Sequence, residues 1–160
     1  MGKVIGIDLG TTNCCVSVLE GGTVQIISNK EGGRTTPSVV GFTDKDERLV
    51  GQIAKRQAVT NAANTLYAVK RLIGRKFESP EVEKMRTTVP FDICKAPNGD
   101  AHIRVLDRIY SPPEIRAMVL QRLNFAAHEF LGAQIRSPLL DVPRVCDDMP
   151  RPRHGLPVKT

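Results

Sequence analysis

Residues 3–19 read KVIGIDLGTTNCCVSVL, which puts two strand-like segments on either side of a short polar loop. Lys3–Asp8 and Asn13–Leu19 are rich in apolar and β-branched residues, as short strands are. A third segment of this kind, Thr23–Ile27, follows the turn residues Glu20–Gly22. The amino terminus is therefore predicted to form an antiparallel meander of three strands.

The loop from Asp8 to Asn13 contains residue types that suit an anionic ligand. Gly10 lets the backbone approach a ligand, turn amides can converge on a phosphate, and the hydroxyls of Thr11 and Thr12 add donors. Asp8 ends the first strand, where one carboxylate can hold a hydrated magnesium ion. Six residues of this kind also form ordinary polar hairpin turns, and the loop alone favours that simpler interpretation. A P-loop is excluded, because no glycine-rich loop precedes Gly-Lys-Ser or Gly-Lys-Thr.

The middle of the chain is predicted to mix short strands with helices after a polar loop, Asn29–Pro37. The expected elements are strands around Ser38–Phe42 and Arg48–Gly51, helical stretches over Gln52–Leu72 and Pro80–Thr87, and a hairpin of Phe91–Lys95 with Ala101–Val105. Four residues, Pro97 to Asp100, join the hairpin strands. Their Asn-Gly pair suits the positive backbone angles of a tight turn.

Pro112–Leu131 has the clearest helical signals in the sequence. Ser111 can cap its start, proline suits its first position, Glu114 completes a capping box, and Gly132 is a typical end. Apolar residues recur at helical spacing along one face, namely Ile115, Met118, Val119, Leu123, Ala126, Ala127 and Phe130. We expect that face to pack on the amino-terminal sheet, with Pro138–Val142 returning as a further strand.

The composition changes after Ser137, where prolines become frequent and apolar periodicity stops beyond Val142. The prolines of this region are Pro138, Pro143, Pro150, Pro152 and Pro157. Each proline removes a backbone donor and fixes φ. We therefore expect residues 1–142 to form one folded unit and residues 143–160 to form a divergent, irregular tail.

The overall composition is that of a globular domain or a large part of one, with 160 residues, 41% hydrophobic and 25% charged. A formal net charge of +6 is compatible with an anionic ligand or partner. The sequence argues against nucleic acid as that partner, because aromatic residues make up only 4% and none are interleaved with a basic run.

Cysteines and histidines form no recognisable metal motif. No two cysteines have the two-residue spacing of a zinc or redox site, and this favours a reduced, cytoplasmic location; they are Cys14, Cys15, Cys94 and Cys146. The isolated histidines are interpreted as surface or packing residues; they are His102, His128 and His154. The first apolar stretch, residues 4–9, is too short for a signal peptide or a membrane span, so no membrane association is expected.

The phosphate-type loop is one of several segments that together form a recognisable pattern. The pattern opens with Gly6–Asn13, followed by Cys15 and Val16. Further segments follow in order, namely Arg34–Ser38, Val50–Gln52, Ala54–Ala58, Asn64–Leu66, Lys70–Arg75 and Ser111–Ile115. In these segments the chain resembles the DnaK-type chaperones of the seventy-kilodalton heat-shock family. The resemblance runs with little interruption from Met1 to about Ile135, whereas a sugar kinase or an actin would share the phosphate loop and little else.

The resemblance implies an α/β fold of the actin-like ATPase (ribonuclease H-like) class, in which two lobes bind ATP or ADP and magnesium between them. Residues 1–142 would form part of the first lobe, a partial nucleotide-binding lobe. The phosphates would be held by Gly10, Thr11, Thr12 and Asn13. Asp8 would face the Mg²⁺ ion through water. Lys70 matches the family lysine that contacts the terminal phosphate and the attacking water, and phosphoryl transfer needs such positioned positive charge.

Two residues of the tail, Pro143 and Arg151, resemble family positions that relay the nucleotide signal toward the substrate domain. Arg151 lies between Pro150 and Pro152, however, and the second proline would clash within any helix there. We therefore expect this relay to be lost.

In the intact family, the resemblance implies an ATP-dependent folding chaperone whose partners are unfolded polypeptides, a J-domain co-chaperone and a nucleotide exchange factor. The second phosphate loop, the adenosine-binding residues and the peptide-binding domain would lie beyond Thr160. An amino-terminal fragment that is inactive alone is therefore the first hypothesis. The alternatives are a non-catalytic truncated remnant or interaction module and, more distantly, a basic nucleic-acid binder.

Overall fold

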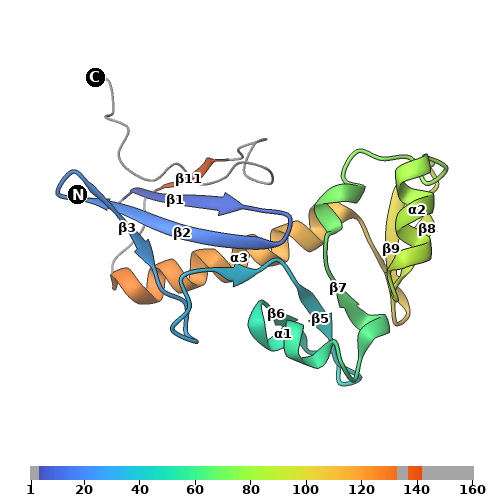
Figure 1. Cartoon of the computed structure of the whole chain (residues 1–160), viewed down its shortest axis with the longest axis horizontal. Helices are drawn as coiled ribbons and strands as arrows, with labels where there is room; N and C mark the ends of the chain where they lie inside the picture. The colour runs from blue at the N-terminus through green and yellow to red at the C-terminus, as the bar shows by residue number, and fades with distance from the viewer. Residues whose placement is uncertain (1–3, 133–136, 142–160) are drawn as a thin grey trace.

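The protein, seen in a computed structural model that describes residues 4–132 and 137–141, combines helices with three β-sheets (Figure 1). A five-stranded sheet lies over the long helix α3, and two three-stranded sheets lie toward the end of the molecule that carries α1 and α2. This is the mixed α/β architecture predicted from the sequence.

The five-stranded sheet contains the predicted meander. β1 (Val4–Leu9), β2 (Asn13–Glu20) and β3 (Thr23–Ile27) pair antiparallel in sequence order. β11 (Ser137–Asp141) pairs parallel with the other edge of β1, which confirms the predicted returning strand as far as its last described residue. β4 (Thr36–Pro37) pairs with the start of β2 and brings the chain that follows it close to the β1–β2 loop.

Helix α3 (Pro112–Leu131) packs on this sheet and begins and ends as predicted. The backbone N–H of Ser111 donates to a carboxylate oxygen of Glu114 at 2.6 Å, and the N–H of Glu114 donates to the hydroxyl of Ser111 at 3.4 Å. This is the expected capping box. Gly132 ends the helix in the left-handed conformation, with a φ of 57°.

The buried face of α3 packs against the five-stranded sheet and consists of Ile115, Val119, Leu123 and Ala127. Met118 is partly buried beside this face. The prediction is wrong for Phe130, which is 56% exposed although it continues the apolar stripe. Phe130 lies in the last turn of α3, in which Leu131 packs against the core instead.

Residues 52–72 differ most from the prediction of a single helical stretch. They form α1 (Gln52–Gln57), a 3-10 turn at Ala62–Asn64, β7 (Thr65–Leu66) and a second 3-10 turn, η2 (Val69–Leu72). The expected stretch is therefore helical only at its two ends and at one short turn between them.

Side-chain hydrogen bonds and strand pairing interrupt this helix. The amide of Asn61 donates to the carbonyl oxygen of Phe42 at 2.8 Å, and the hydroxyl of Thr65 donates to the carbonyl oxygen of Asn61 at 2.7 Å. Such bonds compete with the helical backbone pattern. β7 then pairs with β5 (Val40–Phe42), which also pairs with β6 (Arg48–Val50).

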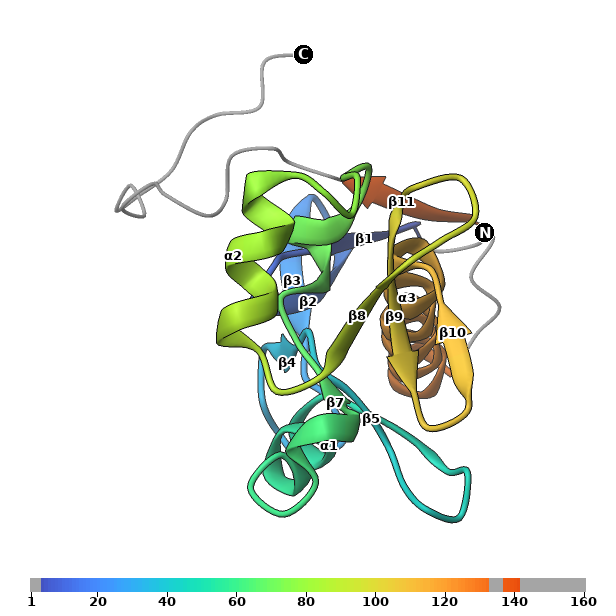
Figure 2. The ribbon, with the colours of Figure 1, turned by 90° about the vertical axis from the view of Figure 1, so that its right-hand side faces the viewer.

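The third sheet extends the predicted hairpin. β8 (Asp92–Lys95) and β9 (Ala101–Val105) pair antiparallel as expected, and α2 (Pro80–Thr88) follows the predicted helix. β10 (Arg108–Tyr110) adds a strand that was not predicted. Figures 1 and 2 show this sheet and α2 at the same end of the molecule.

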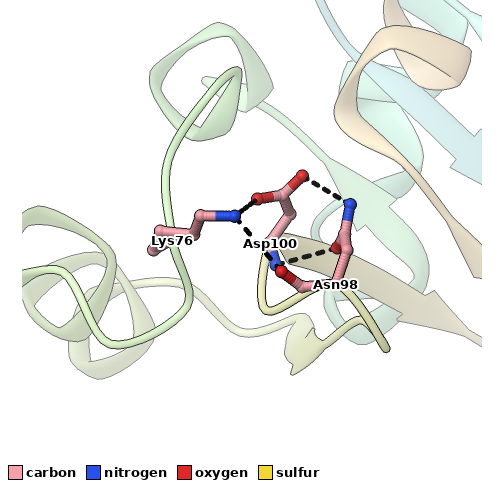
Figure 3. A network of polar contacts seen from close by, with 3 residues as sticks. All are labelled: Lys76, Asn98 and Asp100. Carbon is pink, nitrogen blue, oxygen red and sulfur yellow. Dashed lines mark hydrogen bonds and ion pairs between the residues drawn. The ribbon is translucent and has the colours of Figure 1, made fainter.

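A polar network around Asp100 holds the β8–β9 turn (Figure 3). Asp100 accepts from the ammonium of Lys76 at 2.6 Å and from the side-chain amide of Asn98 at 2.8 Å. Of the Asn-Gly pair only Gly99 has a positive φ, 85°, so the turn differs from the expected one. Asn98 instead uses its side-chain oxygen to accept from the N–H of Asp100 at 3.0 Å.

One buried apolar core joins the three sheets, and each sheet contributes a fully buried residue, namely Ile7, Leu66 and Ile103. The ring of Phe42 on β5 stacks on that of Tyr110 on β10, with centroids 5.1 Å apart. The sheets are therefore one packed unit, and this packing holds η2 near the end of β1.

Candidate functional site

The loop between β1 and β2 is short and tightly built. β1 ends at Leu9 and β2 begins at Asn13, so Gly10, Thr11 and Thr12 make the whole connection. A side chain at Gly10 would overlap the backbone oxygen of Asn13, so only glycine fits there. Thr12 and Asn13 are exposed, whereas Thr11 is only 8% exposed. The outer part of the loop is thus accessible to a ligand.

Ser38, just after β4, supports the loop from one side, and it was not among the predicted site residues. Its hydroxyl donates to the carbonyl oxygen of Gly10 at 2.8 Å, and its N–H donates to the carbonyl oxygen of Thr12 at 2.9 Å. The Sγ atom of Cys14 lies 2.9 Å from the same hydroxyl oxygen, and burial raises the pKa of this thiol. Nothing in the sequence pattern indicates these contacts.

Lys70 lies beside the loop although 61 positions separate it from Leu9 in the sequence. Its Nζ atom donates to the carbonyl oxygen of Leu9 at 3.4 Å. Ala68, with a left-handed φ of 55°, turns the chain into η2, where Val69 and Leu72 are buried as anchors. The structure therefore brings together the predicted lysine and the predicted phosphate loop.

The fold and this arrangement coincide with a family match, because the family model for the Hsp70 protein matches residues 4–153. The chain belongs to the Hsp70 family. Hsp70 proteins are chaperones of an ATPase family, and the Hsp70 domain has the actin-like ATPase fold. The predicted fold class is thereby confirmed, with the described α/β arrangement as part of a first lobe.

Behind the loop of this Hsp70 chain lies a small cavity, between the loop, η2 and α3. Its volume of about 30 Å³ is room for one or two water molecules and too small for a phosphate group. Lys70 and Arg116 line it, and none of its described lining residues is a carboxylate. The Nη2 atom of Arg116 is buried and has no hydrogen-bond partner among the described residues. Arg116 was not predicted, because a single arginine within a helical pattern gives no signal.

A larger cavity, of about 370 Å³, opens beside the loop. Thr11 and Thr12 line one part of it, and Lys55 and Tyr67 line another. Pockets of a few hundred cubic ångströms are typical of small-ligand sites. The Hsp70 loop is thus bordered by a space of ligand size.

Asp8 lies one residue before the end of β1 and is half-buried. Its backbone pairs with Cys15 on β2 and with Asp141 on β11, at the end of the sheet that carries the loop. Magnesium commonly uses one or two carboxylates and keeps several waters. Among residues 4–132 and 137–141 no group of three His, Cys, Asp or Glu side chains could hold a metal ion directly. Asp8 thus lies next to the predicted phosphate loop, and its contact to magnesium through water stays a prediction.

Several predicted features lie outside the described residues. They are the relay residues Pro143 and Arg151, together with the rest of the tail, 143–160. His102 and His128 are described, and neither belongs to a possible metal group. No helix in the described part of the chain has the length and apolar character needed to cross a membrane.

Proposed function

We propose that this Hsp70-family chain binds the phosphates of ATP or ADP, together with Mg²⁺, at the Gly10–Asn13 loop. The observation that carries the proposal is the 3.4 Å contact between the Nζ atom of Lys70 and the carbonyl oxygen of Leu9. It sets a positive charge beside a loop whose amides and hydroxyls suit an anion. Gly10, which no other residue can replace, supports the same interpretation, because close backbone approach is what a phosphate loop needs.

Each assigned residue has a distinct role in this proposal. The loop amides and the exposed hydroxyl of Thr12 bind phosphate oxygens. Lys70 stabilises the charge that develops on the terminal phosphate during transfer. Asp8 would face a magnesium ion through water. The ion would supply positive charge against that of the phosphates.

We also expect residues 1–160 alone to bind nucleotide weakly and not to hydrolyse ATP through repeated turnovers. The residues assigned here come from one side of a cleft, and groups that act as a unit lose most of their effect when part of the unit is missing. No adenosine-binding residue is assigned in this chain. Binding on the order of millimolar, or about 4 kcal/mol, is therefore expected. A non-catalytic interaction module is the alternative, and it predicts no response to nucleotide.

The wider role follows from the DnaK-type resemblance. It comprises ATP-dependent folding in the cytoplasm, with unfolded polypeptides, a J-domain co-chaperone and a nucleotide exchange factor as partners. Family membership is the support for these partners. No described residue of this chain is assigned to contact them.

Nuclear magnetic resonance titration of the isotope-labelled chain tests the proposal. MgATP and MgADP should shift the amide signals of the loop residues Gly10, Thr11, Thr12 and Asn13, with a Kd on the order of 1 mM. Adenosine, which has no phosphate, should leave these signals unchanged. Loop signals that do not move at saturating MgATP, or that move equally with adenosine, contradict phosphate binding at this loop.

A further inference from the structure

Ser38 is bonded to the loop at two separate points, although it belongs to a different segment of the chain. Its hydroxyl donates to the carbonyl oxygen of Gly10, and its N–H donates to that of Thr12. The distances, 2.8 and 2.9 Å, are those of good hydrogen bonds. The acceptors belong to the Gly10–Thr11 and Thr12–Asn13 peptide groups, so Ser38 restrains the peptide groups on both sides of the Thr11–Thr12 peptide at the centre of the loop.

These two bonds determine where two loop amides point. The described peptide bonds are all trans, and in a planar trans peptide the C=O and the following N–H point in opposite directions. Gly10 turns its oxygen toward Ser38, so the N–H of Thr11 points away from Ser38. The bond to Thr12 directs the N–H of Asn13 away from Ser38 in the same manner. Both amides belong to the residues to which phosphate binding was assigned.

Cys14 lies against both groups of the first bond. Its Sγ atom is 2.9 Å from the hydroxyl oxygen of Ser38, and its thiol donates to the carbonyl oxygen of Gly10 at 3.8 Å. The Cys14 side chain is 2% exposed, and burial raises the pKa of the thiol, so the thiol keeps its proton. The thiol, the Ser38 hydroxyl and the Gly10 carbonyl therefore form one cluster of mutual hydrogen bonds behind the loop.

We propose that Ser38 is a positioning residue that keeps the phosphate loop in its binding conformation, with Cys14 in contact with its hydroxyl. The link to phosphate rests on the function proposed above, whereas the link to loop conformation rests on the hydrogen bonds alone. Ser38 would not contact the phosphate itself. It would act through Gly10 and Thr12, whose carbonyl oxygens it holds.

The test compares Ser38→Ala with Ser38→Thr, which keeps the hydroxyl, and with Ser17→Ala as a matched control. Ser17 donates from its hydroxyl to the carbonyl oxygen of Gly6 at 3.5 Å, a bond in the same sheet but away from the loop. Two quantities are measured on the 160-residue chain. They are amide hydrogen exchange at Thr11 and Asn13, and affinity for inorganic tripolyphosphate.

Ser38→Ala should speed exchange of the two loop amides by about three- to tenfold and weaken tripolyphosphate binding by a similar factor, as loss of one good hydrogen bond does. Ser38→Thr should restore both quantities, and Ser17→Ala should change neither. The proposal would be overturned if Ser38→Ala had the amide exchange rates and the tripolyphosphate affinity of the wild type. A wild-type chain that binds no tripolyphosphate would refute the proposed function, and the exchange rates would still decide whether Ser38 holds the loop.

Discussion

The ammonium of Lys70 donates to the carbonyl oxygen of Leu9, the residue at which β1 ends. The acceptor is neutral, so this bond orients the ammonium without cancelling its charge. An oriented charge beside the loop is what phosphoryl transfer requires, because its transition state is stabilised by positioning and electrostatics.

Lys70→Ala should therefore lower ATP turnover while leaving ATP affinity largely intact. The measurement is steady-state phosphate release by a chimera in which residues 1–135 are grafted onto the remainder of a related chaperone. Loss of one transition-state contact of this kind costs about 10²- to 10³-fold in kcat. Arg71→Ala changes the exposed neighbour of Lys70 in η2 and should have no such effect. Unchanged turnover in Lys70→Ala would remove the role assigned to this lysine.

Gly10→Ala should abolish phosphate binding at the loop. The added methyl would overlap the backbone oxygen of Asn13, so the loop must rearrange to admit it. Gly32→Ala is the control, since Gly32 has a φ of 77° but no atom near its missing side chain. It should cost about 1 kcal/mol in stability from the left-handed backbone and leave binding unchanged. The measurement is tripolyphosphate titration with chemical denaturation, and wild-type affinity in Gly10→Ala would contradict the expectation.

The packing of α3 predicts that two apolar residues of this helix contribute very differently to stability. Leu123 is 2% exposed, so Leu123→Ala should lower the free energy of unfolding by about 2–5 kcal/mol. Phe130 is 56% exposed, and Phe130→Ala should change the free energy of unfolding by about 0.5 kcal/mol or less. Urea denaturation measures both values. A large loss in Phe130→Ala would show that something in the chain covers the last turn.

The capping box predicts a pH-dependent contribution from Glu114. The backbone N–H of Ser111 donates to this carboxyl and is the main cause of a pKa below the ordinary 4.5. The hydroxyl of Ser111 lowers this pKa further. A pKa lowered by folding stabilises the protein above the unfolded pKa, and this stabilisation is lost as the pH falls through the folded pKa. Glu114→Gln should therefore be less stable than wild type at neutral pH, and the difference should narrow below pH 4.5.

Denaturation at several pH values measures this difference. Glu83→Gln is the matched control, because Glu83 is also a first-turn carboxylate but α2 has no side-chain capping bond at its N-cap residue, Ser79. A difference between Glu114→Gln and wild type that stays constant down to about pH 3 would contradict the assigned titration.

The parts of the fold that could be predicted have local signals. Both ends of α3 are marked by residues within one turn, Ser111 with Glu114 at the start and Gly132 at the end. The β1–β2–β3 meander is similarly marked by short apolar runs and glycine turns. These signals do not depend on distant parts of the chain, so the sequence contains them in full.

The parts that were missed depend on long-range contacts or on unmarked turns. The helical pattern is broken at Asn61, because the side-chain amide of this residue donates a hydrogen bond to the carbonyl oxygen of Phe42, 19 positions away. β10 follows a turn in which Leu106 has a φ of 51°, a conformation that glycine or asparagine usually adopts, so the turn lacks its usual sequence signal. Ser38 and Arg116 reach the site only after folding, and their neighbours in the sequence do not show this.

The two neighbours of β1 are made at different times during synthesis. β2 follows β1 directly, whereas β11 pairs Pro138 with Ile5, about 130 residues later. Until the ribosome has released β11, one edge of β1 has its backbone donors and acceptors unpaired, and such edges recruit other strands. Completion of the sheet is also slowed by the long loop that must close. A nascent chain of this protein therefore passes through a period in which it is itself a candidate for aggregation.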